Sequence, residues 1–314
     1  MAEEREGVRL AEGKYQDGIH EFIAGRARRS AGFDMGEPHY HPYHELYYVI
    51  SGRCRMFVQH DIYYASAGDI LFLPPYSLHR SCYEKGQTVD RFVACFTPGY
   101  IRAFTETRDA YIGDHETGEG GAGEGAGPVL FPWQKLTVPQ PERERVEQLF
   151  ADMIRETLQR DCYTDLQKKS LLFQLLTLLG RCRQPALLQG SQQLEQGDGA
   201  VQTAARFIYQ HHREPVSLAQ AADVGHLSPT YFSKRFRQVT GMGFKEYLTH
   251  VRLLDAMQLL KTTGMSITDI ALTCGFSDGN YFGDVFKKAQ GISPDRFRKG
   301  LGFEAVKETV QGRA

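Results

Sequence analysis

The hydrophobic and polar residues of the N-terminal part of the chain follow the pattern of short β-strands. Runs rich in aromatic and β-branched residues occupy 45–50, 54–59, 69–73 and 91–96, and each run is bounded by Gly, Pro, Ser or Asp. Runs of this length, separated by turn residues, are typical of strands. Several such strands in succession predict a small barrel or sandwich.

The segment after about residue 129 follows a helical pattern instead. Apolar residues recur three and four positions apart, as on one helix face; they are Val146, Leu149, Phe150, Met153, Ile154, Thr157 and Leu158. A second helix is predicted by a leucine-rich run, made up of Leu171, Leu172, Leu175, Leu176, Leu178 and Leu179. Its apolar arc is wider than a surface helix needs. Two interpretations stay open: these helices pack against the barrel, or they form a dimer interface.

Two low-complexity stretches separate the structured segments. Residues 117–128 are a glycine-rich insertion, and residues 184–200 are a polar linker. We therefore predict a barrel at 1–116 and helices at 129–183 that complete this sensor domain and serve dimerisation. A helical domain follows at 201–300, and a short tail at 301–314.

The C-terminal segment contains two copies of one unit. Ser217, Leu218 and Ala222 recur 49 residues later as Ser266, Ile267 and Ala271, and a serine follows each alanine six positions on, at Ser228 and Ser277. The pattern Tyr-Phe-xxx-Phe-xxxx-Gly then occurs at 231–241 and again at 281–291. Each unit has the size of a helix–turn–helix motif. Between them, 244–261 is predicted as an amphipathic helix with these inward residues: Tyr247, Leu248, Val251, Leu254, Met257 and Leu260.

The first unit has the start signals of a helix suited to reading DNA. Ser228 is a preferred N-cap and Pro229 a preferred first helical residue. Phe232, Phe236 and Val239 are predicted to face the core. The opposite face, which lies in the major groove when such a motif binds DNA, carries Thr230, Ser233, Lys234 and Arg237. These side chains can contact base edges and phosphates.

The second unit offers a weaker set of contacts. Phe282, Phe286 and Ala289 are predicted to face inward, and the outward positions are Asn280, Gly283, Asp284 and Lys287. Asn280 suits adenine and Lys287 supplies a positive charge, whereas Asp284 repels phosphate. We therefore expect the first helix to contribute most of the readout and the second mainly to position the domain.

Charge and composition narrow the function classes. Residues 201–300 carry 13 Lys and Arg against 8 Asp and Glu, whereas residues 1–200 carry 22 against 28. A basic domain on an acidic body suits a polyanionic partner. The 41% hydrophobic and 24% charged residues of the 314 exclude a disordered or collagen-like chain. No apolar run reaches membrane-span length, the charged start is not a secretory signal, and the six cysteines form no C-x-x-C pair. We expect a cytoplasmic protein without membrane attachment.

Residues 201–300 resemble the DNA-binding domain of the AraC/XylS family of bacterial transcription regulators. The matching positions are Ala222, Ser228, 231–241, Ala256, Leu259, Leu260, 267–277 and 281–298. The resemblance implies binding to double-stranded DNA, a homodimer, and contact with RNA polymerase if the protein is an activator. Gly283 and Asp284 depart from the polar or basic residues usual in the family, which weakens the base contacts expected of the second helix.

The N-terminal segment resembles the two motifs of a cupin barrel, the sensor domain expected in this family. In metal-binding cupins the ligands correspond here to His39, His41, Glu45 and His79, and strand alternation places the first two on one side. Three imidazoles and a carboxylate suit a divalent metal: Fe, Mn, Ni or Zn. In the alternative interpretation no cofactor is required, and these groups bind a ligand or one another. Tyr76 stands where cupins usually have glycine. His44 is expected at the surface.

Aromatic residues cluster near these motifs, at Tyr43, Tyr47, Tyr48, Phe72 and Tyr76. Aromatic faces with a few polar groups suit a sugar, although at least half of these residues are expected to be core. The predicted effector-binding residues are His39, His41, Glu45, His79, Tyr43 and Tyr47.

These observations predict a multidomain α and β protein: a cupin-like β-barrel with a helical hairpin, then an all-α double helix–turn–helix. The predicted function is a sequence-specific DNA-binding regulator controlled by a small carbohydrate. A metal-dependent cupin enzyme with a helical appendage is the alternative, but no Ser/His/Asp or Cys/His arrangement favours catalysis.

Overall fold

The computed structural model describes residues 21–30, 38–83, 88–112, 131, 134–159, 161–182 and 197–300. The insertion predicted at 117–128, the tail at 301–314 and most of the predicted linker lie outside these residues. The described residues belong to two compact units, one covering 21–182 and the other 197–300. Among them, no helix has both the length and the apolar character needed to cross a membrane.

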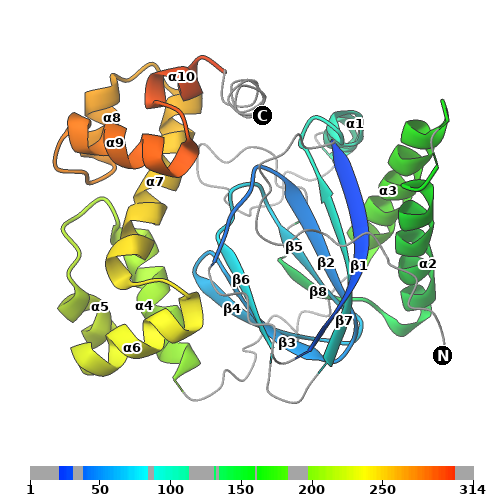
Figure 1. Ribbon diagram of the computed structural model, residues 1–314, viewed down its shortest axis with the longest axis horizontal. Coiled ribbons are helices and arrows are strands. Elements are labelled where there is room, and N and C mark those ends of the chain that lie inside the picture. The colour runs from blue at the N-terminus through cyan, green and yellow to red at the C-terminus, as the bar shows by residue number, and fades with distance from the viewer. Residues whose placement is uncertain are drawn as a thin grey trace, which may run out of the picture. The chain divides into compact units, whose positions relative to one another are not determined.

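The first unit is built on two antiparallel sheets (Figure 1). The larger sheet has the strand order β1 (Phe22–Ser30), β7 (Thr88–Phe96), β2 (His44–Ser51), β5 (Asp69–Leu73) and β8 (Lys135–Thr137). The smaller sheet has the order β4 (Asp61–Ser66), β3 (Arg53–Val58) and β6 (His79–Tyr83). The predicted β-rich N-terminal domain is confirmed, and β1, β4, β6 and β8 add strands that the sequence pattern did not predict.

Alternating side chains of the larger sheet serve two different cores. One set faces the smaller sheet and forms the barrel interior; it includes Tyr47, Val49, Leu71, Leu73, Val93 and Cys95. The other set faces outward toward the helices; it includes Leu46, Tyr48, Ile70, Phe72, Phe92, Ala94 and Phe96. Because successive residues of a strand point to opposite faces, one strand such as β2 contributes to both cores.

Helices α2 (Gln140–Glu156) and α3 (Thr164–Arg181) cover the outer face of the larger sheet (Figure 1), and a further helix, α1 (Arg102–Ile112), follows β7. Buried side chains along their inner faces join the sheet in one core: Val146, Leu149, Phe150, Met153, Leu171, Leu172, Leu175, Leu176 and Leu179. Contact with both the sheet and the other helix explains the wide apolar arc of α3. Leu158, predicted on the inner face, is 69% exposed because α2 ends at Glu156 before reaching it.

The second unit consists of two helical triads joined by α7 (Phe244–Thr262). The first triad contains α4 (Asp198–His211), α5 (Leu218–Val224) and α6 (Pro229–Thr240); the second contains α8 (Ile267–Thr273), α9 (Gly279–Gln290) and α10 (Pro294–Arg298). Helix α4 begins inside the predicted linker. Along α7, Leu253 is buried and Leu254 only partly, which reverses the expectation for this pair.

The two repeats differ by one residue within the helix–turn–helix turn. His226 adopts φ +53° in the first turn, and Gly275 adopts φ +84° at the matching position of the second. A non-glycine residue in this left-handed conformation costs about 1 kcal/mol. The extra residue of the second turn shifts the cap, so that α9 is capped by Asp278 whereas α6 is capped by Ser228. Ser277, which stands at the repeat position of Ser228, is therefore not the N-cap of α9.

We predict a pH dependence of stability from His250, which is buried on α7. Burial lowers the pKa of His250 to about 4, below the unfolded value of about 6.5. The unfolded chain therefore binds the proton more strongly, and the stabilisation present above pH 6.5 is lost as the pH falls toward 4. The parent chain is expected to lose about 2 kcal/mol of unfolding free energy between pH 8 and pH 5 through this group. His250→Gln stays neutral and does not lose it, so the difference in unfolding free energy between the two chains shrinks by that amount. Denaturant unfolding at both pH values measures this gap, and a gap that does not change with pH would contradict the prediction.

Candidate functional site

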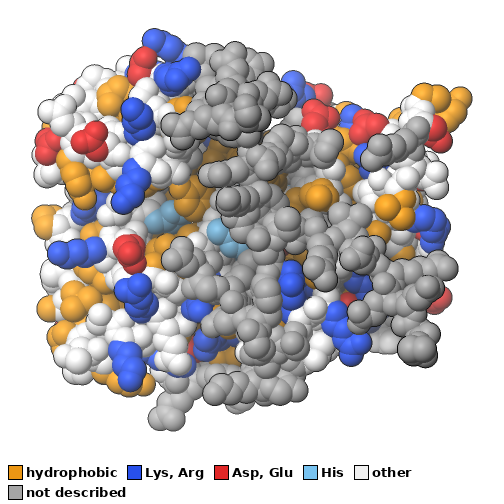
Figure 2. Space-filling model, in the orientation of Figure 1, with side chains coloured by type: hydrophobic (Ala, Val, Ile, Leu, Met, Phe, Trp, Pro, Cys, Tyr) orange, Lys and Arg blue, Asp and Glu red, His pale blue; other side chains and the backbone are white. Residues whose placement is uncertain are grey.

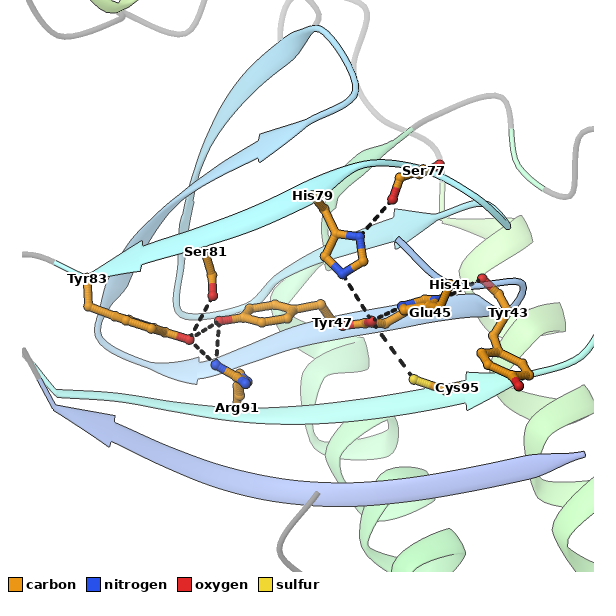
Figure 3. A network of polar contacts seen from close by, with 10 residues as sticks. All are labelled: His41, Tyr43, Glu45, Tyr47, Ser77, His79, Ser81, Tyr83, Arg91 and Cys95. Carbon is orange, nitrogen blue, oxygen red and sulfur yellow. Dashed lines mark hydrogen bonds and ion pairs between the residues drawn. The ribbon is translucent and has the colours of Figure 1, made fainter. Parts of the chain in front are cut away.

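A cluster of imidazoles surrounds the buried carboxylate of Glu45 inside the barrel (Figure 3). His41 Nε2 lies 2.9 Å from Glu45 Oε2, and His79 Nε2 lies 3.7 Å from the same oxygen. His39 joins them because its backbone forms a β-bridge with His79, which brings the two ring centroids to 4.2 Å. The four predicted residues therefore come together. Cys95, which the sequence pattern did not single out, adds a thiol 3.9 Å from Glu45 Oε2.

The cluster holds the negative carboxylate of Glu45 beside the buried imidazole of His79. Burial raises the pKa of Glu45, but the hydrogen bond from His41 and the charges of the neighbouring rings outweigh it and lower the pKa to about 2. Burial and the neighbouring His39 lower the pKa of His79 to about 3. Because His79 Nδ1 lies 2.8 Å from the carbonyl oxygen of Ser77, Nδ1 is the donor in the neutral ring and the lone pair sits on Nε2, toward Glu45.

The donor set fits a divalent metal. Ligand atoms of His39, His41 and His79 lie within 4.8 Å of one another, as do those of His41, Glu45 and Cys95. His79 Nε2 is buried and makes no hydrogen bond among the described residues. A neutral imidazole lone pair and an ionised carboxylate are the forms that bind transition metals.

A second polar network lies in the same interior, around Arg91 of β7. Its Nη1 donates to the Tyr47 hydroxyl at 3.4 Å and to the Tyr83 hydroxyl, and its guanidinium carbon lies 4.9 Å from the centre of the Tyr47 ring. Ser81 Oγ is 3.2 Å from the Tyr83 hydroxyl. Figure 3 shows both networks meeting along β2, where Glu45 and Tyr47 point to the same side. Sequence reasoning missed Arg91, although its spacing from Val93 and Cys95 places a charge on the apolar face of a predicted strand.

The aromatic residues near the motifs divide between the two cores. Tyr43 and Tyr47 are buried in the interior. Tyr48 and Phe72 belong to the outer core instead, where the Tyr48 hydroxyl donates to Glu147 at 3.0 Å. These two residues are therefore among the aromatics that serve as core, since their strand parity turns them away from the barrel interior.

Two residues of the motifs behave differently from expectation. His44 is not at the surface: its ring stacks on Phe72 and Phe96 at 5.4 Å each, and burial lowers its pKa to about 4. Tyr76, in the cupin glycine position, adopts φ +63° and donates its backbone N–H to the carbonyl oxygen of His41. The left-handed backbone explains why glycine suits this position.

The first predicted DNA-reading face is exposed along α6. Thr230, Ser233, Lys234 and Arg237 are all exposed, while Phe232 and Phe236 opposite them are fully buried. In Figure 2, Lys and Arg side chains are spread over the visible face of this unit among fewer acidic ones.

The second predicted face, along α9, has the same arrangement with different chemistry. Asn280, Asp284 and Lys287 are exposed and Gly283 is partly buried. Ala289, predicted to face inward, is exposed. Phe282 and Phe286 are the fully buried side chains of this helix.

Two family models match the chain, one in each unit. An AraC-like ligand binding domain matches residues 23–176, and a helix-turn-helix domain matches residues 221–300. Together they span about three quarters of the chain. The chain belongs to the AraC family of transcription regulators.

Relatives of this AraC-family protein are regulators as well. It is 27% identical over 272 residues to the HTH-type transcriptional activator RhaS of Enterobacter sp. (strain 638). The aligned residues cover 83% of this chain and 87% of that protein. RhaS of Escherichia fergusonii is 31% identical over 163 residues, covering 52% of this chain and 56% of that protein. The prediction of a DNA-binding regulator is confirmed, and the alternative of a cupin enzyme is set aside.

Solved structures also resemble this AraC-family chain. The C-terminal domain of AraT, a response regulator from Geobacillus stearothermophilus, is 33% identical, covers 32% of this chain and 84% of its own, and has a TM-score of 0.31. ToxT from Vibrio cholerae O395 is 13% identical, covers 88% of this chain and 97% of its own, and has a TM-score of 0.33. The family assignment rests on the sequence matches and not on these two likenesses.

Proposed function

We propose that this regulator responds to a small polyhydroxylated effector, a sugar, that binds inside the barrel. The residues proposed to bind it are His39, His41, Glu45, His79, Tyr43 and Tyr47. The observation that carries the proposal is the placement of a carboxylate, three imidazoles and two phenols between the two sheets, all of them buried except His39, which is partly buried. Buried polar groups are costly unless they are hydrogen-bonded, and sugar hydroxyls are partners that can both donate and accept.

The DNA-binding unit is proposed to read duplex DNA through Thr230, Ser233, Lys234 and Arg237 of α6, with Asn280 and Lys287 of α9 adding weaker contacts. The effector changes DNA binding by favouring one arrangement of the regulator over another, since only differential affinity shifts an equilibrium. We further propose that the protein acts in the cytoplasm as a homodimer and contacts RNA polymerase where it activates. The large exposed hydrophobic residues around the α2–α3 turn, Leu158, Tyr163 and Leu166, support a dimer through these helices.

A thermal-shift screen of the full chain against neutral sugars, sugar acids and polyols tests the effector proposal. A ligand at 100 times its Kd adds about 2.7 kcal/mol to the domain it binds. Since each kcal/mol moves the Tm of a domain of this size by about 2–4 °C, a true effector is expected to raise it by roughly 5–10 °C.

Neighbouring tyrosines of β2 supply a matched pair of variants for this screen. Tyr47→Phe removes an interior hydroxyl and is expected to reduce the shift, whereas Tyr48→Phe removes an outer-core hydroxyl and is expected to leave it intact. If no compound in the screen moves the Tm, or if Tyr48→Phe loses the response and Tyr47→Phe keeps it, the barrel interior is not the effector site.

A divalent metal held by His39, His41, Glu45 and His79 is a second proposal for the same interior, favoured by the buried, unbonded His79 Nε2. Such an ion would act as a Lewis acid for effector hydroxyls, while Glu45 and the imidazoles would orient it. We predict that Ni²⁺ or Zn²⁺ raises the Tm of chelator-treated protein.

His79→Ala is expected to abolish that metal response, because it removes one of the four ligands. His226→Asn serves as the control, since His226 is exposed in a different unit and Asn tolerates its left-handed backbone. Metal analysis of the purified protein gives an independent readout. A response that survives in His79→Ala and disappears in His226→Asn would place the metal elsewhere.

A further inference from the structure

Arg91 is the interior residue whose chemistry the proposed sugar site does not use. It is 6% exposed and projects from β7 on the same side as Val93 and Cys95, into the space between the sheets (Figure 3). A guanidinium stays charged at any physiological pH, and burying a charge is expensive unless its surroundings compensate for it. The nearby Glu45 carboxylate and the hydroxyls of Tyr47 and Tyr83 compensate part of this cost for Arg91, so the barrel interior holds a cation supported by its surroundings.

The groups around Arg91 are hydroxyls that accept a hydrogen bond from Nη1 and carry a proton of their own. Tyr47 and Tyr83 both approach Nη1 through their hydroxyls, and Ser81 approaches the Tyr83 hydroxyl. A guanidinium and neutral hydroxyls can all donate at once to a single anionic group, and a planar carboxylate matches the guanidinium with two parallel hydrogen bonds.

This donor group lies beside the Glu45 cluster. Glu45 and Tyr47 are two positions apart on one face of β2, which separates their Cα atoms by about 7 Å. That spacing is close to the length of a six-carbon sugar. The interior therefore has an end suited to hydroxyls, at Glu45 and His41, and an end suited to a negative charge, at Arg91.

We propose that the effector is a sugar acid, a polyhydroxylated molecule whose carboxylate binds Arg91 with help from Tyr47 and Tyr83. This inference rests on the proposed function of the barrel as a sugar site and narrows its ligand class. Arg91 acts as the specificity-determining residue that separates acids from neutral sugars of the same size.

Matched ligand pairs test the inference on the full chain. Isothermal titration compares D-galacturonate with D-galactose, D-glucuronate with D-glucose, and D-gluconate with D-glucitol, with D-glucose 6-phosphate as a fourth kind of anion. Because hydrogen bonds to charged groups are the stronger ones, at least one acid is expected to bind roughly tenfold or more tighter than its neutral partner. Raising the ionic strength is expected to weaken the acid more than the neutral sugar.

Variants assign the preference to Arg91. Arg91→Gln is expected to remove the preference for the acid, and Tyr83→Phe, which keeps the ring and is less disruptive to folding, is expected to reduce it severalfold. Arg53→Gln, an exposed arginine on β3 that also stacks on a tyrosine, is the matched control and is expected to change nothing.

The outcomes separate this inference from the proposed function. Tighter binding of a neutral sugar than of its acid would overturn the inference and leave a sugar sensor standing. A preference for the phosphate over every carboxylate would also overturn it, as would an acid preference that survives both Arg91→Gln and Tyr83→Phe. Binding of none of the acids or sugars would remove the proposed sugar site and this inference together.

Discussion

Replacing Lys234 and Arg237 with alanine is expected to weaken DNA binding by at least about 30-fold, which corresponds to about 2 kcal/mol at 1.4 kcal/mol per factor of ten. Both side chains are exposed on the outward face of α6, opposite the buried Phe232 and Phe236. Each base contact of this kind is worth about 1–3 kcal/mol. Each lost phosphate contact reduces the steepness of log affinity plotted against log salt concentration by about one.

The measurement uses a DNA duplex that the parent protein selects from a random pool, with Kd determined by fluorescence anisotropy at several salt concentrations. Asn280→Ala with Lys287→Ala on α9 is the internal comparison, and we expect it to cost less. Asp284→Asn is expected to tighten binding, because it removes an exposed negative charge from the face of α9 that we propose contacts DNA. A larger loss on α9 than on α6 would show that the second repeat dominates the readout.

Replacing Asp198 with asparagine is expected to cost about 3 kcal/mol of stability in the DNA-binding unit, as breaking a buried pair does. Asp198, the first residue of α4, is fully buried and its Oδ1 accepts from Arg235 Nη2 of α6 at 2.6 Å. Removing the charge leaves a guanidinium that is only 16% exposed without its counter-ion.

Asp295 supplies the matched control for this substitution. It also lies in the first turn of a helix, α10, and pairs with Lys299 at 2.8 Å, but both side chains are more than half exposed. Exposed pairs contribute little, so Asp295→Asn is expected to change stability by less than about 0.5 kcal/mol. Urea unfolding of the two variants is followed by hydrogen exchange of the backbone amides in α4 and α6, which gives the unfolding free energy of the DNA-binding unit. Equal losses would contradict the role given to burial.

The helical repeat could be predicted from the sequence because the residues that start and orient each helix lie within the helix itself. A cap, a proline and apolar residues three and four apart predict α6 without reference to the rest of the chain, and the structure agrees. The errors also have local causes. Ala289, predicted to face inward, is small enough to remain exposed near the end of α9, and on α7 Leu253 is buried in place of the predicted Leu254.

The barrel was harder to predict from the sequence because its strands pair with strands that lie far away along the chain. Strand β1 pairs with β7 across the sequence from Phe22 to Phe96, yet it contains three arginines and only a few buried residues, so its own pattern is weak. The histidines and Glu45 were found through two local motifs, one containing His39, His41 and Glu45 and the other ending at His79. Cys95 faces Glu45 only through the β2–β7 register, which spacing along the chain does not reveal.

The contacts of Arg91 have a consequence for how selective the barrel is. Nη1 of the guanidinium already donates to the Tyr47 and Tyr83 hydroxyls, so the proposed carboxylate would accept from Arg91 in place of these two oxygens while the phenols turn their own O–H groups toward it. The measured affinity is then a difference between two sets of hydrogen bonds. A neutral molecule of the right size that cannot replace the hydrogen bonds of Arg91 loses them on binding and forms none in return. Abundant neutral metabolites are therefore expected to bind the barrel weakly and to cause no response in the DNA-binding unit.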